Sequence, residues 1–381
     1  MAVTSWPFKR RLCHDDDFKR IIVVVTRQIG DVLLTTPLIR EARERWPHAA
    51  IDVLGFAGTL GMLRGNPDVN RLIEVPAGST WWQSLPLIVR LWRRYDLGLV
   101  AQYTDRAHLY AWVAASVRAG QAPEGRASWL KAALLAHTVY LGGDHSHVVL
   151  EKLKLMLPWV PAPMPPRVVP PAPGELDSAL RERLGERYVV IQIPSLVHYK
   201  QWPIRHFRSL LSGLLERGLR VVLSGGPSAG DKALVSQAAE GHEGEVVDLC
   251  GMLDLNQMRT LLGGAVAYVG PDTSITHLTA ASGVPTIALF GPVDPRIWGP
   301  WPNGWPATQP YERRALRQSR GNVVVLQGPP ACVPCNGAGC DGHNGSRSEC
   351  LETLSPARVL AEVDLLLGRP AAESGHNPAD E

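Results

Sequence analysis

The sequence predicts an α/β protein built from two domains of similar design. Its 381 residues exceed the usual size of one domain, and 45% of them are hydrophobic, so each half can bury its own core. Two series of apolar, β-branched runs alternate with helical segments, a pattern typical of parallel sheets covered by helices. Between the two series, residues 158–173 contain eight prolines and are expected to form a stiff, extended linker.

These observations divide the chain at the linker. The last residues are polar and are expected to be disordered, whereas the first residues form an extension to which the sequence assigns no role. The predicted segments are an N-terminal extension (1–19), a first α/β domain (20–157), the linker (158–173), a second α/β domain (174–368) and a tail (369–381).

The first domain opens with β-branched residues at 21–26, as expected for a strand that is buried on both faces. In the helix that follows, Leu34, Leu38 and Ala42 recur at four-residue spacing, and Pro37 should kink the helix or mark its true start. The predicted elements of this domain are strands at 21–26, 51–54 and 97–101, and helices at 31–45 and 84–94.

The predicted helix at 84–94 is rich in both apolar residues and arginines. The apolar residues expected to share one face are Leu85, Ile88, Val89 and Trp92. The basic residues expected to lie away from that face are Arg90, Arg93 and Arg94. Such a face predicts packing against the domain's own sheet. Contact with a membrane surface is the alternative, and the role of the preceding pair, Trp81 and Trp82, stays open.

The second domain repeats the alternation after the linker. Its strands are short apolar runs, and several end in Gly or Pro turns. The predicted elements are strands at 188–193, 220–224, 266–270 and 286–290, and helices at 206–217 and 276–282.

Charge and hydropathy exclude several classes of protein. The formal net charge is +3, which does not predict nucleic-acid binding but is compatible with a weak attraction to an anionic membrane surface. No apolar run approaches the roughly 18 residues that span a bilayer, and the N-terminus lacks the apolar core of a signal peptide. We therefore expect a cytoplasmic protein.

The residues that suggest chemistry follow the ends of strands, and ligands of open parallel sheets bind at this edge. Gly30 permits a tight turn after the first strand, and Asp31 follows it at the start of a helix. The helix dipole and the free N–H groups there favour an ionised carboxylate. The alternative is that Asp31 only caps the helix.

Two loops of the second domain occupy the same position. The loop at 195–202 contains Lys200, a flexible cation suited to a phosphate, although a lysine in such a loop is often merely solvated. Ser224, Gly225 and Gly226 end the next strand. The two glycines let the backbone approach a ligand, or they simply form a turn.

The loop from Gly270 to Ser274 is the strongest candidate for a nucleotide site. A strand ends there in Gly-Pro, and Asp272 and Thr273 precede the start of a helix. Free N–H groups and hydroxyls at a helix N-terminus are suited to a diphosphate. His277 lies one turn into the helix, where it can point back toward the loop or pack inward.

Four late cysteines have the spacing C-x2-C-x4-C-x9-C, which does not match the paired spacing of a zinc ribbon. They are Cys332, Cys335, Cys340 and Cys350. We interpret them as reduced cysteines in a surface loop, with a structural zinc site as the alternative.

Several short segments occur in a fixed order along the chain. They are GDVLLTTPL at 30–38, KQWP at 200–203, GGP at 225–227, DTSITHL at 272–278 and ALFGP at 288–292. Together they resemble glycosyltransferase family 9, the bacterial ADP-heptose:lipopolysaccharide heptosyltransferases and their relatives. The resemblance covers about residues 20–365. It implies a GT-B fold, in which two Rossmann-like domains face a central cleft, with the acceptor in the first domain and the nucleotide-sugar in the second.

The resemblance also assigns roles to single residues. Asp31 matches the proposed general base of the family, which takes the proton of the acceptor hydroxyl. Lys200 matches the lysine near the donor diphosphate, where it offsets charge on the leaving group. Gly30 belongs to the turn on the acceptor side. The residues expected to bind the nucleotide-sugar are Ser195, Lys200, Ser224, Gly225, Gly226, Asp272, Thr273, Ser274 and His277.

The implied function is inverting transfer of heptose, or a related sugar, from a nucleotide diphosphate to a lipopolysaccharide core or another lipid-linked oligosaccharide. ADP-heptose is the expected donor, no cofactor or metal is implied, and peripheral contact with the cytoplasmic face of the inner membrane is compatible with this acceptor. Loops 56–64 and 102–108 are expected to face the acceptor. Two alternatives stay open: a sugar-nucleotide epimerase of GT-B fold, and a sugar-nucleotide-binding module without catalysis.

Overall fold

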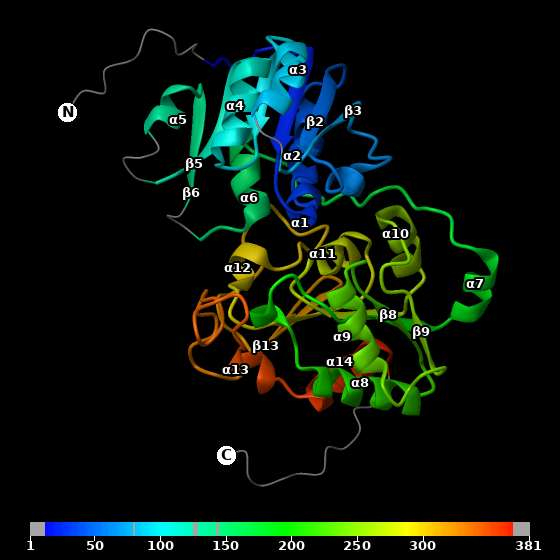
Figure 1. The fold of residues 1–381 in the computed structure, drawn as a ribbon. Helices are drawn as coiled ribbons and strands as arrows, with labels where there is room; N and C mark the ends of the chain where they lie inside the picture. Colours follow the sequence, from blue (N-terminus) through cyan, green and yellow to red (C-terminus); the bar gives the residue numbers. More distant parts are fainter. Residues whose placement is uncertain (1–11, 79–80, 125–128, 142–144, 369–381) are drawn as a thin grey trace. The chain divides into compact units, whose positions relative to one another are not determined.

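The computed structural model describes residues 12–78, 81–124, 129–141 and 145–368. The chain divides into two compact units (Figure 1). The first unit runs to Ala172 and also contains Asn303–Pro310, whereas the second contains Pro173–Pro302 and the chain from Tyr311 onward. The return of a short late segment to the first unit was not predicted from the sequence. The tail expected to be disordered lies outside the described residues.

The first unit is built on a six-stranded sheet in which all paired strands are parallel. Its spatial order is β3-β2-β1-β4-β5-β6, so the chain builds outward from β1 on one side and then returns to add β4 on the other. The strands are β1 (Arg20–Val25), β2 (Ala50–Phe56), β3 (Arg71–Val75), β4 (Tyr95–Val100), β5 (Ala115–Pro123) and β6 (His137–Leu141).

The segment predicted as one helix at 31–45 forms two helices. Pro37 lies in the first turn of the second helix, where its missing N–H costs nothing, so it marks a helix start as predicted. The helices of this unit are α1 (Ile29–Leu33), α2 (Thr36–Arg45), η1 (Leu60–Leu63), α3 (Trp81–Leu91), α4 (Asp105–Ala114), α5 (Trp129–Ala133), α6 (Val148–Leu153) and η3 (Lys154–Met156).

The predicted orientation of α3 is wrong. The face that points into the core contains Ser84, Leu87, Ile88 and Leu91. The side chains of Leu85, Val89 and Trp92, which were expected to point inward, are exposed. Apolar residues occupy both faces of this helix, so periodicity alone does not determine which face is buried. The question about Trp81 and Trp82 concerns side chains outside the described part of the structure.

The described part of the N-terminal extension and the proline-rich segment both pack into the first unit. Phe18, Trp46 and Trp159 form a buried cluster in which the ring centroids lie 5.1–5.6 Å apart. Residues 161–173 form neither helix nor strand, as predicted. They are nevertheless anchored, because the backbone N–H and C=O of Val168 both bond to the side chain of Asn303.

The second unit has a seven-stranded sheet in the order β12-β13-β11-β10-β7-β8-β9. Only the edge strand β12 is antiparallel to its neighbour. Around β7 the parallel strands repeat the arrangement found around β1: two later strands on one side, and then a return to the other side. The strands are β7 (Tyr188–Gln192), β8 (Arg220–Ser224), β9 (Val246–Asp248), β10 (Ala267–Pro271), β11 (Thr286–Phe290), β12 (Arg317–Arg320) and β13 (Val323–Gln327).

Both faces of the central strands of this sheet are buried, which explains why these strands are mostly continuous apolar runs. In β11, Ile287 and Leu289 join one core cluster, and Ala288 and Phe290 join another. The helices are α7 (Ser178–Leu184), η4 (His198–Lys200), α8 (Ile204–Glu216), α9 (Ala229–Ala239), α10 (Leu255–Gly263), α11 (Ser274–Ala281), α12 (Pro295–Trp298), α13 (Glu349–Glu352) and α14 (Pro356–Leu366). No helix among the described residues is long and apolar enough to cross a membrane.

Candidate functional site

Each sheet has a point at which the order of its strands reverses. In the first unit this point lies between β1 and β4, and in the second it lies between β7 and β10. Ligands of open parallel sheets bind beyond the carboxyl ends of the strands at such a point. The residues predicted from the sequence to carry chemistry follow β1, β7, β8 and β10, so most of them lie at these two reversal points.

Asp31 lies in the first turn of α1, directly after β1. Its interpretation as a simple N-cap is wrong, because Gln28 occupies the N-cap position. The carboxylate is 12% exposed, and its Oδ2 lies 3.6 Å from Nε of Arg27. A carboxylate at this place feels the positive end of the helix dipole and still has oxygen lone pairs available for another partner.

A lysine that the sequence analysis missed contacts the main chain of Asp31. The ammonium of Lys152, on α6, donates to the backbone carbonyl of Asp31 at 2.7 Å and to Oγ1 of Thr35 at 2.8 Å. Thr35 in turn donates to the same carbonyl at 2.7 Å. Lys152 is completely buried, and burial lowers its pKa to about 8 although the nearby charge of Asp31 favours the protonated form.

The sequence does contain a trace of this lysine. Val149, Lys152, Leu153 and Met156 follow the spacing of a buried helical face, and all four are buried. A lysine at such a position is rarely fully buried unless it has partners. Its presence on an apolar face therefore indicated a polar partner, but not which residue would provide it.

The loop after β4 adds polar groups at the same edge of the first unit. The amide of Gln102 donates to Thr26, at the end of β1, and to Thr104 at 3.1 Å. The guanidinium of Arg27 lies 5.8 Å from the ring centroid of Tyr103. The structure thus brings the loop 102–108 next to the end of β1, whereas the loop 56–64 follows β2, one strand further out.

In the second unit, Lys200 and Asp272 form a direct ion pair. Nζ of Lys200 lies 2.6 Å from Oδ2 of Asp272, whose side chain is only 8% exposed. On its other side, Oδ1 of Asp272 lies 3.7 Å from Nε2 of His277. Neighbouring strands β7 and β10 bring these groups together, because Lys200 follows β7 and Asp272 follows β10.

The start of α11 offers backbone N–H groups beside this ion pair. Thr273 is the N-cap residue, but its side chain makes no capping hydrogen bond, and Ser274 begins the helix. The first N–H groups of a helix have no partner within it, so they can bind an anion. Thr276 fixes the turn by donating to the carbonyl of Pro271 at 2.5 Å. A side chain at Gly270 would lie 2.4 Å from Oη of Tyr268, so only glycine fits there.

The loop that presents Lys200 is held by its own neighbours. Gln201 accepts from the N–H of Ser195 at 3.0 Å and donates to the carbonyl of Ile193 at 2.8 Å. The hydroxyl of Ser195 donates to Val197 at 2.6 Å. Trp202 is completely buried and donates to the carbonyl of Leu354 at 2.9 Å. Gln201 and Trp202 were quoted in the sequence motif without a role, and the structure shows that they anchor this loop.

The segment after β8 is tightly packed. The hydroxyl of Ser224 is buried and bonds to Oε1 of Gln192 at 2.7 Å. A side chain at Gly225 would lie 2.7 Å from Sγ of Cys250, and one at Gly226 would lie 2.3 Å from the carboxylate of Asp231. Close packing therefore explains Gly225, whereas the Asp231 side chain beside Gly226 can turn away. Any contact of Ser224, Gly225 and Gly226 with a ligand remains a prediction.

Comparison with known proteins identifies the relatives of this chain. A family model described as glycosyltransferase family 9 (heptosyltransferase) matches residues 86–314. The chain is 31% identical over 292 residues to lipopolysaccharide heptosyltransferase 3 of Escherichia coli, covering 72% of this chain and 84% of the relative. It is 30% identical over 381 residues to lipopolysaccharide heptosyltransferase 1 of Pseudomonas aeruginosa, covering 92% and 99%.

The chain belongs to glycosyltransferase family 9. The family assignment and the enzyme class, a glycosyltransferase, agree with the sequence prediction. The structure resembles ADP-heptose lps heptosyltransferase II of E. coli with a TM-score of 0.68 and 21% identity, covering 91% of this chain and 98% of that one. It resembles the family 9 glycosyltransferase of Veillonella parvula with a TM-score of 0.70 and 18% identity, covering 92% and 97%. These similarities confirm the predicted GT-B fold.

The late cysteines of this family 9 chain do not form a metal site in the described structure. No group of three or more His, Cys, Asp or Glu side chains in the described ranges is arranged to hold a metal ion. All four cysteines are free; three are exposed, and burial raises the pKa of the Cys350 thiol to about 12. The neighbouring thiols of Cys335, Cys332 and Cys340 raise this pKa further, so the four cysteines lie near one another, and the zinc alternative stays open.

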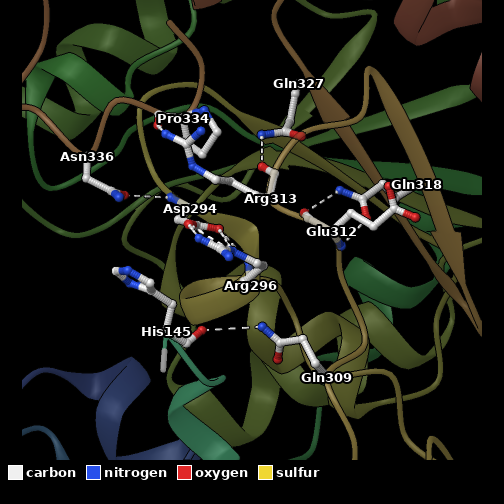
Figure 2. A network of polar contacts seen from close by, with 10 residues as sticks. All are labelled: His145, Asp294, Arg296, Gln309, Glu312, Arg313, Gln318, Gln327, Pro334 and Asn336. Carbon is white, nitrogen blue, oxygen red and sulfur yellow. Dashed lines mark hydrogen bonds and ion pairs between the residues drawn. The ribbon is translucent and has the colours of Figure 1, made fainter. Parts of the chain in front are cut away.

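The cysteine-containing segment instead supports loops at the carboxyl edge of the second sheet. Figure 2 shows Asn336 bonded to the buried turn after β11: its side chain accepts from the N–H of Asp294 at 3.0 Å. Asp294 also forms an ion pair with Arg296 at 2.7 Å. On the other flank, the carbonyl of Asn344 accepts from the N–H of His198, two residues before Lys200. The sequence analysis assigned no such role to this segment.

Proposed function

We propose that this family 9 glycosyltransferase transfers heptose, or a related sugar, from a nucleotide diphosphate to a lipopolysaccharide core or another lipid-linked oligosaccharide. ADP-heptose is the proposed donor. The names of the relatives support this proposal, because they include lipopolysaccharide heptosyltransferases 1 and 3. A structural neighbour is described as E. coli heptosyltransferase WaaC with ADP-2-deoxy-2-fluoro heptose, at a TM-score of 0.65.

The placement of Asp31 is the observation that carries the proposal. In the proposed reaction its carboxylate takes the proton of an acceptor hydroxyl as that oxygen attacks the anomeric carbon of the donor. The bond from the anomeric carbon to the diphosphate breaks, and the nucleoside diphosphate leaves with the electron pair. A single displacement of this kind inverts the anomeric configuration. The carboxylate is suited to this role because the guanidinium of Arg27, which pairs with it, lies at 3.6 Å and not in close hydrogen-bonding contact.

We assign Lys152 a positioning role in this reaction. Its ammonium bonds to the main-chain carbonyl of Asp31 and to Thr35, not to the carboxylate. This arrangement fixes the turn that carries Asp31 and places a positive charge nearby, while leaving the carboxylate oxygens able to accept a proton. Small errors in the position of a catalytic group are costly, so a fixed turn has a direct effect on rate.

The pair of Lys200 and Asp272 suits the donor side. When a diphosphate binds, Lys200 exchanges its carboxylate partner for a phosphate oxygen, and the first N–H groups of α11 supply further hydrogen bonds. His277 remains beside Asp272, with its Nε2 3.7 Å from Oδ1. In this proposal Lys200 and the helix N-terminus offset the charge that develops on the leaving group, so no metal is required. We further propose that the enzyme works at the cytoplasmic face of the inner membrane, where a lipid-linked acceptor is presented.

Product analysis tests the function. Purified protein is incubated with ADP-heptose, with and without a core oligosaccharide acceptor, and the Asp31→Ala variant is measured in parallel. We expect acceptor-dependent transfer by the wild type, and retained donor binding without transfer by the variant. An exposed carboxylate on α7 provides the matched control, Glu182→Ala, which should transfer normally.

Three outcomes would contradict the proposal. Isomerisation of the sugar-nucleotide without acceptor would favour an epimerase. Donor binding without transfer to any core acceptor would favour a binding module. A thermal shift with GDP- or UDP-linked sugars, but not with ADP-heptose, would replace the proposed donor.

A further inference from the structure

The outer faces of α3 and α4 expose large apolar side chains that the core does not use. We define the α3–α4 face by five residues with their exposed fractions: Leu85 (44%), Val89 (69%), Trp92 (56%), Leu109 (46%) and Trp112 (38%). Single exposed apolar residues are common on soluble proteins, but a group of this size on two adjacent helices indicates a binding surface.

The two helices pack side by side, so these residues share one surface (Figure 1). The hydroxyl of Tyr110, on α4, donates to Ser84, on α3, at 3.2 Å. At the far end of α3, the rings of Trp92 and Trp112 meet edge to face, with centroids 6.4 Å apart. Leu85 and Val89 lie on one side of α3 and Trp92 directly follows the helix at the same spacing, whereas Leu109 and Trp112 are similarly spaced on α4.

The charges around this face are mainly positive. The segment from Trp81 to Ala114 contains four arginines and two aspartates. Both aspartates have local partners: Asp105 pairs with Lys131 at 2.7 Å, and Asp96 accepts from the main-chain N–H groups of Lys19 and Arg20. Three exposed arginines lie beside the apolar stripe and not in it, at the end of α3 and in the turn that follows: Arg90, Arg93 and Arg94.

We propose that the α3–α4 face binds a bilayer that contains anionic phospholipids. Tryptophan and aliphatic side chains enter the boundary between headgroups and acyl chains, and the arginines contact lipid phosphates. The guanidinium of Arg93 already lies 5.9 Å from the ring centroid of Trp92, which joins the cationic and aromatic parts of the face. A second copy of the chain fits less well, because a two-fold contact through this face would bring like-charged arginines together.

This inference deepens the membrane contact proposed above and rests on that part of the proposed function. It does not depend on the transfer reaction, since vesicle binding is measured without donor or acceptor. A protein that binds vesicles but transfers no sugar would contradict the proposed reaction alone, and a protein that transfers sugar to a soluble acceptor without binding vesicles would contradict the surface alone.

Flotation with lipid vesicles provides the test. The full-length protein should float with vesicles of phosphatidylglycerol and phosphatidylethanolamine, and not with vesicles of phosphatidylcholine alone. Trp92→Glu should lower the partition coefficient by about tenfold or more. The matched control is Leu365→Glu on α14, because Leu365 is 55% exposed and Trp92 is 56% exposed. Arg90→Gln and Arg94→Gln should each lower it by about fivefold, more strongly at low salt.

Thermal unfolding of every variant shows whether the fold is retained, and Val89→Glu serves as the second variant if Trp92→Glu unfolds. Equal flotation of Trp92→Glu and Leu365→Glu would overturn the proposal, as would equal binding to anionic and phosphatidylcholine vesicles. Sedimentation velocity provides the remaining outcome. A wild-type dimer that Trp92→Glu converts to a monomer, without vesicle binding by either, would assign the face to self-association instead.

Discussion

The two units of this glycosyltransferase hold an acidic residue at the reversal point of the sheet in different ways. In the first unit, the lysine nearest to Asp31 bonds to its main-chain carbonyl, and the carboxylate itself has Arg27 at 3.6 Å. In the second unit, Lys200 contacts the carboxylate of Asp272 directly at 2.6 Å. The strand order around the two sites is the same, so the difference lies in how each unit places its lysine.

This difference separates two kinds of chemistry. A carboxylate in close contact with an ammonium is committed to that partner and is a poor proton acceptor. A carboxylate whose neighbouring ammonium acts through the main chain gains a fixed position and still has oxygens that can take a proton. The direct ion pair of the second unit suits a lysine that binds an anionic ligand. The main-chain contact of the first unit suits a general base.

Equivalent changes at the two acids should therefore have different effects. Asp31→Asn should lower kcat by about a thousandfold because it removes the proton acceptor, while the donor dissociation constant changes little. Asp272→Asn should mainly change donor affinity, because it releases Lys200. Steady-state kinetics together with calorimetric donor titration distinguish the two. If Asp272→Asn lowered kcat as much as Asp31→Asn, the comparison would be wrong.

The buried charge of Lys152 should be visible in the pH dependence of stability. The unfolded chain keeps this lysine protonated up to its ordinary pKa of 10.5, whereas in the folded protein burial lowers the pKa to about 8. The folded state therefore binds fewer protons between these values, and stability rises with pH across this window. Relative to Lys152→Met, the wild-type free energy of unfolding should increase by up to about 3 kcal/mol from pH 8 to 10.5.

Urea unfolding of both proteins at several pH values measures this increase. The neighbouring Lys154 is the control, because it is partly exposed and pairs with Glu151 at 2.6 Å. Lys154→Met should run parallel to the wild type across the same window. Parallel curves for Lys152→Met and the wild type would show that Lys152 carries no unusual charge cost.

The ion pair in the second unit predicts a smaller effect on binding. Lys200→Met should weaken donor affinity by roughly 30-fold, since hydrogen bonds to charged groups contribute about 2 kcal/mol. Lys232, an exposed lysine on α9, provides the control Lys232→Met, which should bind normally. Calorimetric titration with ADP-heptose measures the donor affinity of both variants. Equal affinities of Lys200→Met and Lys232→Met would show that Lys200 does not bind the donor.

The hydroxyl of Thr35 should give the smallest effect. Thr35→Val removes the hydrogen bonds that Thr35 makes with Lys152 and with the carbonyl of Asp31, so kcat should fall by about fivefold, equivalent to one hydrogen bond of about 1 kcal/mol. Thr353, an exposed residue at the C-cap of α13 in the second unit, makes the same kind of bond to the residue four positions earlier. Initial-rate measurements on Thr35→Val and Thr353→Val test whether the contact at Asp31 matters beyond helix stability. An equal loss of rate in both variants would show that it does not.

The sequence by itself determined the alternation of strands and helices and much of the candidate site. Buried strands such as β1 and β7 are continuous apolar runs, and they were predicted within one or two residues. Lys200 and Asp272 were both predicted at the carboxyl edge of the second sheet, and the resemblance to family 9 assigned both to the donor. Strands such as β3 and β5 were missed, because charged residues or Gly and Pro interrupt their apolar runs.

Only the tertiary structure decided the features that depend on distant parts of the chain. Lys152 meets Asp31 across 121 positions, and periodicity shows only that this lysine lies on a buried face, not which residue it contacts there. The orientation of α3 was likewise undetermined, because a helix with apolar residues on both sides has no single preferred face until its neighbours are in place. Local sequence fixes which elements form, whereas the partner of a buried charge and the exposed side of such a helix depend on packing.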